Sequence, residues 1–211
     1  MQSIAGWLAL KTGDFTSAEI EFNEAFQQQS SSENLVQLIR SKWGQKKYNE
    51  SIKTMQIWLQ GNPQDNKVLL YLAGAYLTLE RYDDAIATYQ KVAVNNPGYV
   101  PALNNLAWLY RDKDLTKAIQ YAEKAHLLAP EDPFVLDTLG MLVLKKGGIE
   151  QAYDLVKKAA ERSPNEAQMH LHLSQILIQK KNYGEAKKIL DAIVSQLPNS
   201  EIGEEARRLL N

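Results

Sequence analysis

The chain has 211 residues, a formal net charge of -1 and a hydrophobic content of 45%. A net charge so close to zero gives no bulk field that would draw the protein to nucleic acid or to an anionic membrane. The absence of cysteine excludes disulfides and thiolate metal sites. No run of about 18 apolar residues is present, so the sequence predicts no membrane-spanning helix.

The first residues lack the basic segment and the long apolar run of a signal peptide. A helical pattern is already established at Ile4 and Leu8, without a preceding capping helix. We therefore expect the chain to be a fragment of a longer protein, with Met1 contributed by cloning. Apolar residues on a first repeat that no capping helix covers also predict a homo-oligomer that forms through the first unit.

Apolar residues recur at helical spacing along the whole chain. In residues 103–110, Leu103, Leu106, Ala107 and Tyr110 fall at positions i, i+3, i+4 and i+7 of one helix face. Prolines follow such segments every 33 or 34 residues, at Pro63, Pro97, Pro130, Pro164 and Pro198. Small residues keep the same period, at Ala18, Ser51, Ala85, Ala118, Ala152 and Ala186. This period predicts an all-α array of stacked helix pairs.

These residues follow the pattern of the tetratricopeptide repeat (TPR) family, which the chain resembles from end to end. The resemblance implies a right-handed α-solenoid of helix-turn-helix units, whose first helices line a concave groove. It divides the chain into six units, residues 1–31, 32–65, 66–99, 100–132, 133–166 and 167–200, followed by a C-terminal capping helix at residues 201–211.

Three of the units depart from the pattern. The first is cut short at its start and ends without a proline. The second carries Ser51, Met55 and Trp58 where small, large and small residues are usual, so we expect it to pack less regularly. The fourth is one residue short, and we expect the deletion in the surface turn at residues 111–115, where it disturbs packing least.

The sequence gives little support for an enzyme. His170 and His172 are two positions apart on one helix, so their side chains point to separate faces and cannot chelate one metal ion. No Gly-rich phosphate loop follows a strand, and no serine lies in a nucleophile-elbow motif. Charged pairs such as Lys145–Lys146 lie where they complement helix dipoles. We predict no catalytic residue, no metal site and no cofactor.

The predicted groove combines aromatic side chains with amides and a few charges, a mixture that suits recognition of a peptide or a partner helix. The alternative is that aromatics such as Tyr71 and Trp108 only pack against neighbouring repeats. The candidate ligand-binding residues are Arg40, Trp43, Tyr71, Asn104, Asn105, Trp108, Asp137, Met141 and His172. The resemblance places Trp7, Gln37, Leu70, Gly74, Thr138 and Gln175 beside them.

Chaperone-binding members of the family hold a terminal carboxylate with Lys, Asn and Arg at set groove positions. The corresponding positions of the third to fifth units hold Leu70, Gly74, Asn105, Phe134 and Thr138. Only Asn105 fits, so we expect no such carboxylate clamp.

A narrower resemblance covers about the last half of the chain. The runs PALNNLAWLY (residues 101–110), AIQYAEKA (118–125) and DTLG (137–140) are similar to the C-terminal repeats of bacterial TPR lipoproteins. Those lipoproteins accompany the exosortase (PEP-CTERM) sorting system and exopolysaccharide production. The resemblance implies a large bacterial parent protein in the periplasm or outer membrane, with the cytoplasm as the alternative compartment.

The leading functional hypothesis is a non-catalytic scaffold that binds a protein or peptide in the groove. The second hypothesis is an envelope component of exopolysaccharide assembly, export or protein sorting that contacts saccharide through tryptophans such as Trp7, Trp43 and Trp108. The third is a structural arm with an inert groove, which positions another domain of a longer chain.

Overall fold

The computed structural model describes residues 3–210, which form thirteen α-helices and no strand. Helices make up 80% of these described residues, and the fold is an all-α helical solenoid as the sequence predicts. Met1, Gln2 and Asn211 lie outside the described residues, and so does the expectation that Met1 comes from cloning.

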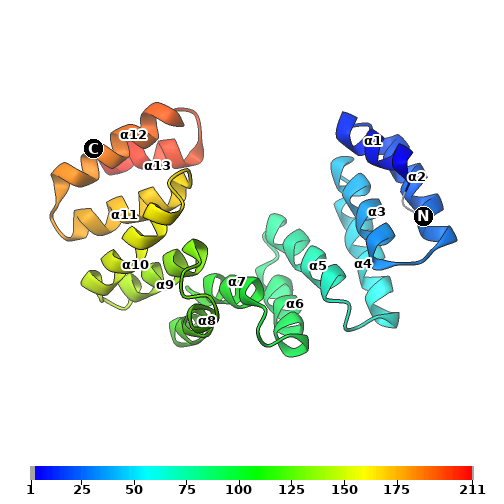
Figure 1. Cartoon of the computed structure of the whole chain (residues 1–211), viewed down its shortest axis with the longest axis horizontal. Helices are drawn as coiled ribbons and strands as arrows, with labels where there is room; N and C mark the ends of the chain where they lie inside the picture. Colours follow the sequence, from blue (N-terminus) through cyan, green and yellow to red (C-terminus); the bar gives the residue numbers. More distant parts are fainter. Residues whose placement is uncertain (1–2, 211) are drawn as a thin grey trace. The chain divides into compact units, whose positions relative to one another are not determined.

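The helices alternate as first and second members of consecutive pairs (Figure 1). Their bounds are α1 Ile4–Thr12, α2 Phe15–Gln28, α3 Ser32–Gly44, α4 Tyr48–Gly61, α5 Asn66–Thr78, α6 Tyr82–Asn95, α7 Val100–Tyr110, α8 Leu115–Leu128, α9 Pro133–Lys145, α10 Ile149–Arg162, α11 Ala167–Gln179, α12 Tyr183–Gln196 and α13 Glu201–Leu210. The grouping of these helices into six repeat units and a cap stays a prediction.

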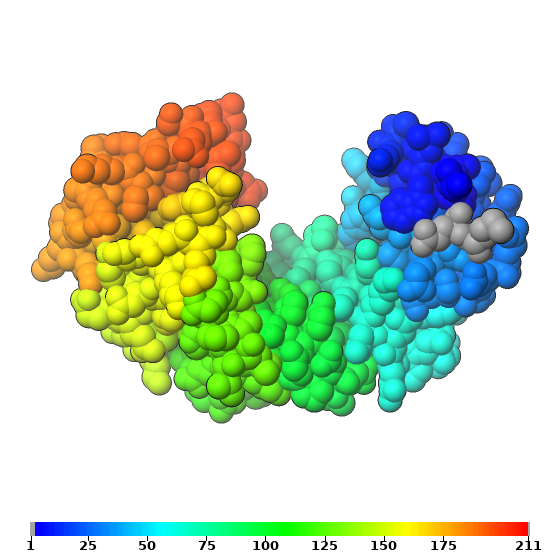
Figure 2. Space-filling view, viewed as in Figure 1, coloured from blue at the N-terminus to red at the C-terminus, as the bar shows by residue number. Residues whose placement is uncertain are grey.

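The chain consists of two compact units, unit 1 with residues 1–102 and unit 2 with residues 103–211. Within unit 1, α1 packs on α2, α2 on α3, α3 on α4, α4 on α5 and α5 on α6. Within unit 2, α8 packs on α9, α9 on α10, α10 on α11, α11 on α12 and α12 on α13. The space-filling view shows consecutive helix pairs of each unit in contact (Figure 2).

Short polar side chains begin many of the helices. The carboxylates of Asp14, Asp65 and Asp114 each accept a hydrogen bond from the backbone N–H three residues later, at the starts of α2, α5 and α8. Asp132 caps α9 in the same way, and Pro133 occupies the first helical position. Each cap satisfies a backbone donor that has no partner inside the helix.

The small residues of the repeat pattern are buried. Ala18, Ser51, Ala85, Ala118 and Ala152 have no exposed surface, and Ala186 is 1% exposed. Gly140 of α9 packs directly on α10, since a Cβ atom there would lie 2.5 Å from Cγ2 of Val156. At the end of the chain, buried Ala206 of α13 packs in a cluster with Leu171, Leu190 and Ile193.

Polar contacts accompany the unusual residues of the predicted second unit. The indole N–H of Trp58 donates to Asp65 at 2.7 Å, and the Trp58 ring lies 5.7 Å from that of Phe26. The Ser32 hydroxyl also donates to Asp65. The side chain of buried Asn34 donates to the carbonyls of Ala25 and Gln29, at 3.1 and 2.9 Å, and so caps the C-terminal end of α2. A proline is therefore not needed there to end the helix.

The fourth unit is one residue short between Tyr110 and Leu115, where the deletion is expected, but helix α7 rather than the turn is shortened. Helix α7 has 11 residues, whereas the first helices α3, α5, α9 and α11 have 13. The turn after α7, residues 111–114, is one residue longer than the three-residue turns after those helices. The deletion therefore shortens helix α7, and the turn that follows it is not shortened.

The reason lies in the turn conformation. Each three-residue turn holds its middle residue at positive φ: Lys46 at 61°, Glu80 at 56°, Gly147 at 96° and Lys181 at 62°. The turn after α7 has no residue at positive φ. Since the left-handed conformation is unfavourable for residues other than glycine, the longer turn avoids that cost.

Candidate functional site

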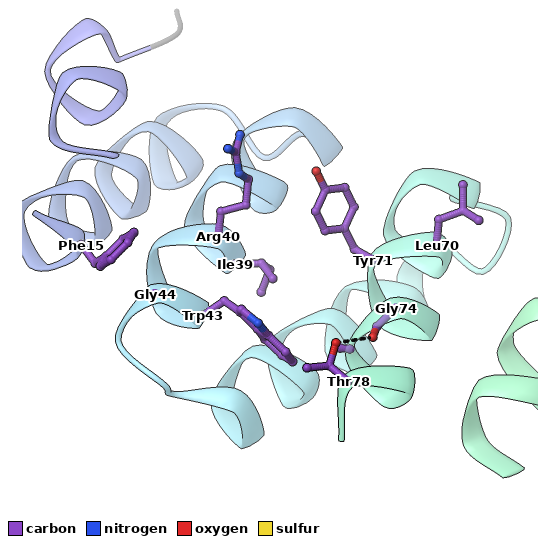
Figure 3. Close-up of a pocket in the computed structure, with 10 residues that line it drawn as sticks. Phe15, Ile39, Arg40, Trp43, Gly44, Leu70, Tyr71, Gly74 and Thr78 are labelled. Atoms are coloured by element: carbon purple, nitrogen blue, oxygen red, sulfur yellow. Dashed lines mark hydrogen bonds between the residues drawn. The ribbon is translucent and has the colours of Figure 1, made fainter. Parts of the chain in front are cut away.

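A pocket of about 610 Å³ lies between the first helices α3 and α5 of unit 1 (Figure 3). We call it the unit 1 pocket. It is lined by Phe15, Ile39, Arg40, Trp43, Gly44, Leu70, Tyr71, Gly74, Ala75 and Thr78. In Figure 3, Arg40 and Trp43 extend from α3, and Leu70, Tyr71 and Thr78 extend from α5.

The lining of the unit 1 pocket is mainly apolar, with one charge. The ring of Trp43 is tilted against that of Tyr48, with centroids 4.5 Å apart. Tyr71 is 40% exposed. The guanidinium of Arg40 donates to the amide oxygen of Gln37 at 3.1 Å and lies 5.6 Å from the ring centroid of Trp7. No carboxylate is among the lining residues.

Two glycines of this pocket have opposite surroundings. A Cβ atom on Gly44 would lie 2.3 Å from the ring of Phe15, so glycine is needed there for α2 and α3 to meet. A Cβ atom on Gly74 would meet no atom within 4 Å. Gly74 therefore borders open space, and its lack of a side chain leaves part of the pocket empty.

A second pocket, of about 370 Å³, lies in unit 2 on the first helices α7, α9 and α11. We call it the unit 2 pocket. Its lining residues are Trp108, Arg111, Asp112, Asp137, Thr138, Met141, Leu142, Leu144, Lys145, His172 and Gln179.

Charged groups of the unit 2 pocket are paired with one another. Nδ1 of His172 lies 2.9 Å from both carboxylate oxygens of Asp137. Lys145 binds Asp112 at 2.5 Å, and this hydrogen bond lowers the pKa of the Asp112 carboxyl. The Arg111 guanidinium lies 3.8 Å from the ring centroid of Trp108 and also contacts Asp112.

Seven of the nine predicted site residues line one of the two pockets. Arg40, Trp43 and Tyr71 line the unit 1 pocket, and Trp108, Asp137, Met141 and His172 line the unit 2 pocket. Asn104 and Asn105 line neither pocket and are half-buried. The side-chain oxygen of Asn104 is buried without a hydrogen-bond partner among the described residues.

Sequence reasoning missed lining residues that come from helix ends and from a neighbouring repeat. Phe15 begins a second helix, and Thr78 ends the helix that carries Gly74. For Lys145 the sequence predicts only a charge that complements a helix dipole. The repeat period itself would have revealed one contact, because Lys145 at the end of α9 comes one repeat, 33 positions, after Asp112 in the turn that follows α7.

The predicted separation of the two histidines is correct. His170 contacts the carbonyl of Pro164 at 3.0 Å, whereas His172 contacts Asp137. In residues 3–210, no three or more His, Asp or Glu side chains form a group that could hold a metal ion. Within the same range, none of the helices has the length and apolar character required to cross a bilayer.

Two family models with the description tetratricopeptide repeat match residues 36–100 and 143–211. The chain belongs to the tetratricopeptide repeat family. Human protein O-mannosyl-transferase TMTC1 is 28% identical over 205 residues, which are 95% of this chain and 23% of that protein. Mouse tetratricopeptide repeat protein 21A is 28% identical over 145 residues, 67% of this chain and 11% of that protein. The chain thus spans less than a quarter of the length of either relative.

Solved structures of TPR proteins have the same fold. PilF of Pseudomonas aeruginosa has a TM-score of 0.77 at 17% identity, over 96% of this chain and 93% of that chain. A TPR protein from Parabacteroides merdae has a TM-score of 0.76 at 16% identity, over 90% and 76% of the two chains. YrrB, described as a TPR protein with an unusual peptide-binding site, has a TM-score of 0.63 at 15% identity, over 89% and 97%.

Proposed function

We propose that this chain is a non-catalytic scaffold that binds a peptide or partner helix through the two pockets on its first helices. The TPR fold itself suggests protein or peptide partners. The observation that carries the proposal is the exposure of two pocket aromatics, Tyr71 at 40% and Trp108 at 41%. Aromatic and Arg side chains in partly open pockets are the usual anchors of protein interfaces.

Two further points support the proposal. The chain's first helices place Arg40, Trp43 and Tyr71 around one cavity, so aromatic area and a charge lie together. YrrB, which has a similar fold, is described as having a peptide-binding site. The transferase name belongs to a human protein of which this chain spans 23%, and we propose no transferase activity for the chain.

The proposal is tested by affinity capture from source cells with three forms of the chain. Trp43→Ala/Tyr71→Ala disables the unit 1 pocket, and Trp108→Ala/Met141→Ala disables the unit 2 pocket. Tyr183→Ala is the control, because Tyr183 is an aromatic that is 62% exposed outside both pockets. We expect a partner that the control retains and at least one pocket variant loses, with circular dichroism unchanged. Equal capture by all forms would contradict the proposal.

Saccharide contact in a bacterial envelope protein is the second candidate. Trp108 lines the unit 2 pocket beside Asp137 and His172, and aromatic rings with polar neighbours can bind sugars. However, the Arg111 guanidinium already covers one face of the Trp108 ring at 3.8 Å. Tryptophan fluorescence during a saccharide titration tests this candidate, and no change in emission would count against it.

Self-association through α1 is a separate proposal. Ile4 is 86% exposed and Leu8 is 63% exposed, so α1 presents an apolar face. Such faces favour association. Sedimentation of the wild type and of Ile4→Ser/Leu8→Ser over a range of concentrations tests the idea. A wild type that stays monomeric throughout would refute it.

A further inference from the structure

Gly74 lies in the middle of α5, where glycine has no local advantage. Its backbone is helical rather than left-handed, and a Cβ atom there would meet nothing within 4 Å. A glycine inside a helix destabilises it by about 1 kcal/mol relative to alanine. Gly140 of α9 differs, because the neighbouring helix leaves no room for a side chain there. The effect of Gly74 is therefore to keep part of the unit 1 pocket open.

Arg40 is the only charged residue that lines this pocket. Its guanidinium contacts the Gln37 amide and the Trp7 ring, and no carboxylate of the described residues pairs with it. In the unit 2 pocket, by contrast, Lys145 pairs with Asp112. A cation at the edge of an apolar cavity favours a ligand with the opposite charge next to an apolar group.

We propose that the unit 1 pocket binds an internal segment of a partner protein in which a large apolar side chain lies close to an acidic one. The apolar side chain occupies the space above Gly74, between Trp43 and Tyr71. The acidic side chain pairs with Arg40. This inference rests on the proposed function and names the kind of peptide that one of its two sites selects.

The ligand is a side-chain carboxylate rather than a free C-terminus. A single arginine faces this pocket, and no lysine or asparagine is among the residues that line it. A cavity of about 610 Å³ is within the range of sites that bury most of a small ligand. It is therefore large enough for one apolar side chain and its neighbours.

The test is selection of a random heptapeptide library, displayed on phage with the C-terminal end of each peptide fused to the coat protein. The library is selected on the immobilised full chain. We expect the recovered peptides to share Leu, Ile, Met or Phe near Asp or Glu. Recovery of peptides without this pair, or of none above background, would overturn the inference.

Binding of the recovered peptides, synthesised with amidated C-termini, is then measured by fluorescence anisotropy. Gly74→Leu should weaken binding at least about tenfold, because leucine fills the space that the ligand needs. Arg40→Gln should weaken it about threefold or more at low salt, and the difference should shrink as salt is added. An affinity for Gly74→Leu equal to that of the wild type would overturn the inference.

Matched controls exist in the same unit. Gly61→Leu makes the same change at another helical glycine with nothing within 4 Å, outside the pocket. Lys53→Gln removes one positive charge from the exposed side of α4. Both should bind like the wild type. Gly74→Met also fills the space above residue 74 and should also weaken binding. It replaces Gly74→Leu in the test if that variant proves unstable on heating.

Different results would refute the pocket chemistry and the proposed scaffold function. If the peptides bind wild type and Gly74→Leu equally but lose affinity for Trp108→Ala/Met141→Ala, the inference is wrong and the proposed scaffold function stands at the unit 2 pocket. If capture from source cells finds no pocket-dependent partner while the selected peptides still require Gly74 and Arg40, the pocket chemistry stands and the proposed function fails.

Discussion

Alanine should have opposite effects at Gly140 and Gly74, two glycines on first helices of the array. In both helices alanine gains about 1 kcal/mol of helix propensity over glycine. At Gly74 nothing opposes this gain, since a Cβ atom meets no atom within 4 Å. Gly74→Ala should therefore raise the unfolding free energy by about 1 kcal/mol.

At Gly140 the neighbouring helix leaves no room for the Cβ atom of alanine. It would lie 2.5 Å from Cγ2 of Val156, 3.2 Å from Cβ of Leu155 and 3.3 Å from the backbone oxygen of Ala152. The backbone contact cannot be relieved by a rotamer change, so α9 and α10 must move apart. Overpacking of this kind costs about 1–3 kcal/mol, and we use the upper end. After the gain in helix propensity, Gly140→Ala should lower the unfolding free energy by about 2 kcal/mol.

Urea unfolding at 25 °C followed by circular dichroism measures both changes. Since stacked repeats do not always unfold in one step, amide hydrogen exchange in α5 and α9 should be measured as well, because it reports each helix locally. The two variants should differ by about 3 kcal/mol. Shifts of the same sign, or a Gly140→Ala variant as stable as the wild type, would refute the packing argument.

Three further substitutions test the contacts of unit 1. Burial alone would raise the pKa of Glu19, but hydrogen bonds from Lys42, Lys47 and Gln45 outweigh it and lower the pKa from 4.5 to about 2. Glu19→Gln should therefore lower the unfolding free energy by about 1–2 kcal/mol at pH 7, and the deficit should disappear as the pH falls from 4.5 towards 2, in urea titrations at several pH values. Asn34→Ala removes two hydrogen bonds at the end of α2 and should cost about 1–3 kcal/mol, with faster amide exchange at residues 25–29; unchanged exchange would exclude the capping role. Trp58→Phe keeps the ring but loses the bond to Asp65, so thermal unfolding should show a loss of about 1–2 kcal/mol, and a melting temperature equal to that of the wild type would show that this bond adds nothing.

The helices of this chain could be predicted because most of the repeats give the same signals. The apolar spacing of Leu103, Leu106 and Ala107 and the regular prolines predict helix pairs, and those three residues are buried. The turn after α7 could not be predicted, since a missing residue can be taken from a helix or from a turn. The choice depends on whether the turn adopts positive φ, which the local sequence does not reveal.

The pockets could be predicted only in part. Helical position placed Arg40, Trp43 and Tyr71 on one face, and the structure brings them to one cavity. It could not reveal that the Phe15 ring rests on Gly44, because that contact joins residues of two different repeats. Nor could it separate the open space at Gly74 from the tight packing at Gly140, since both are glycines in first helices and only the neighbouring helix distinguishes them.

Site-specific photocross-linking in source cells tests the central claim most directly. A photoreactive benzoylphenylalanine replaces Tyr71 in the unit 1 pocket, Trp108 in the unit 2 pocket, or Tyr183 on the exposed surface outside both. We expect covalent adducts with a partner protein from position 71 or 108 and none from position 183. Adducts from position 183 alone, or no adduct from either pocket, would contradict the claim that the chain binds its partners through its first helices.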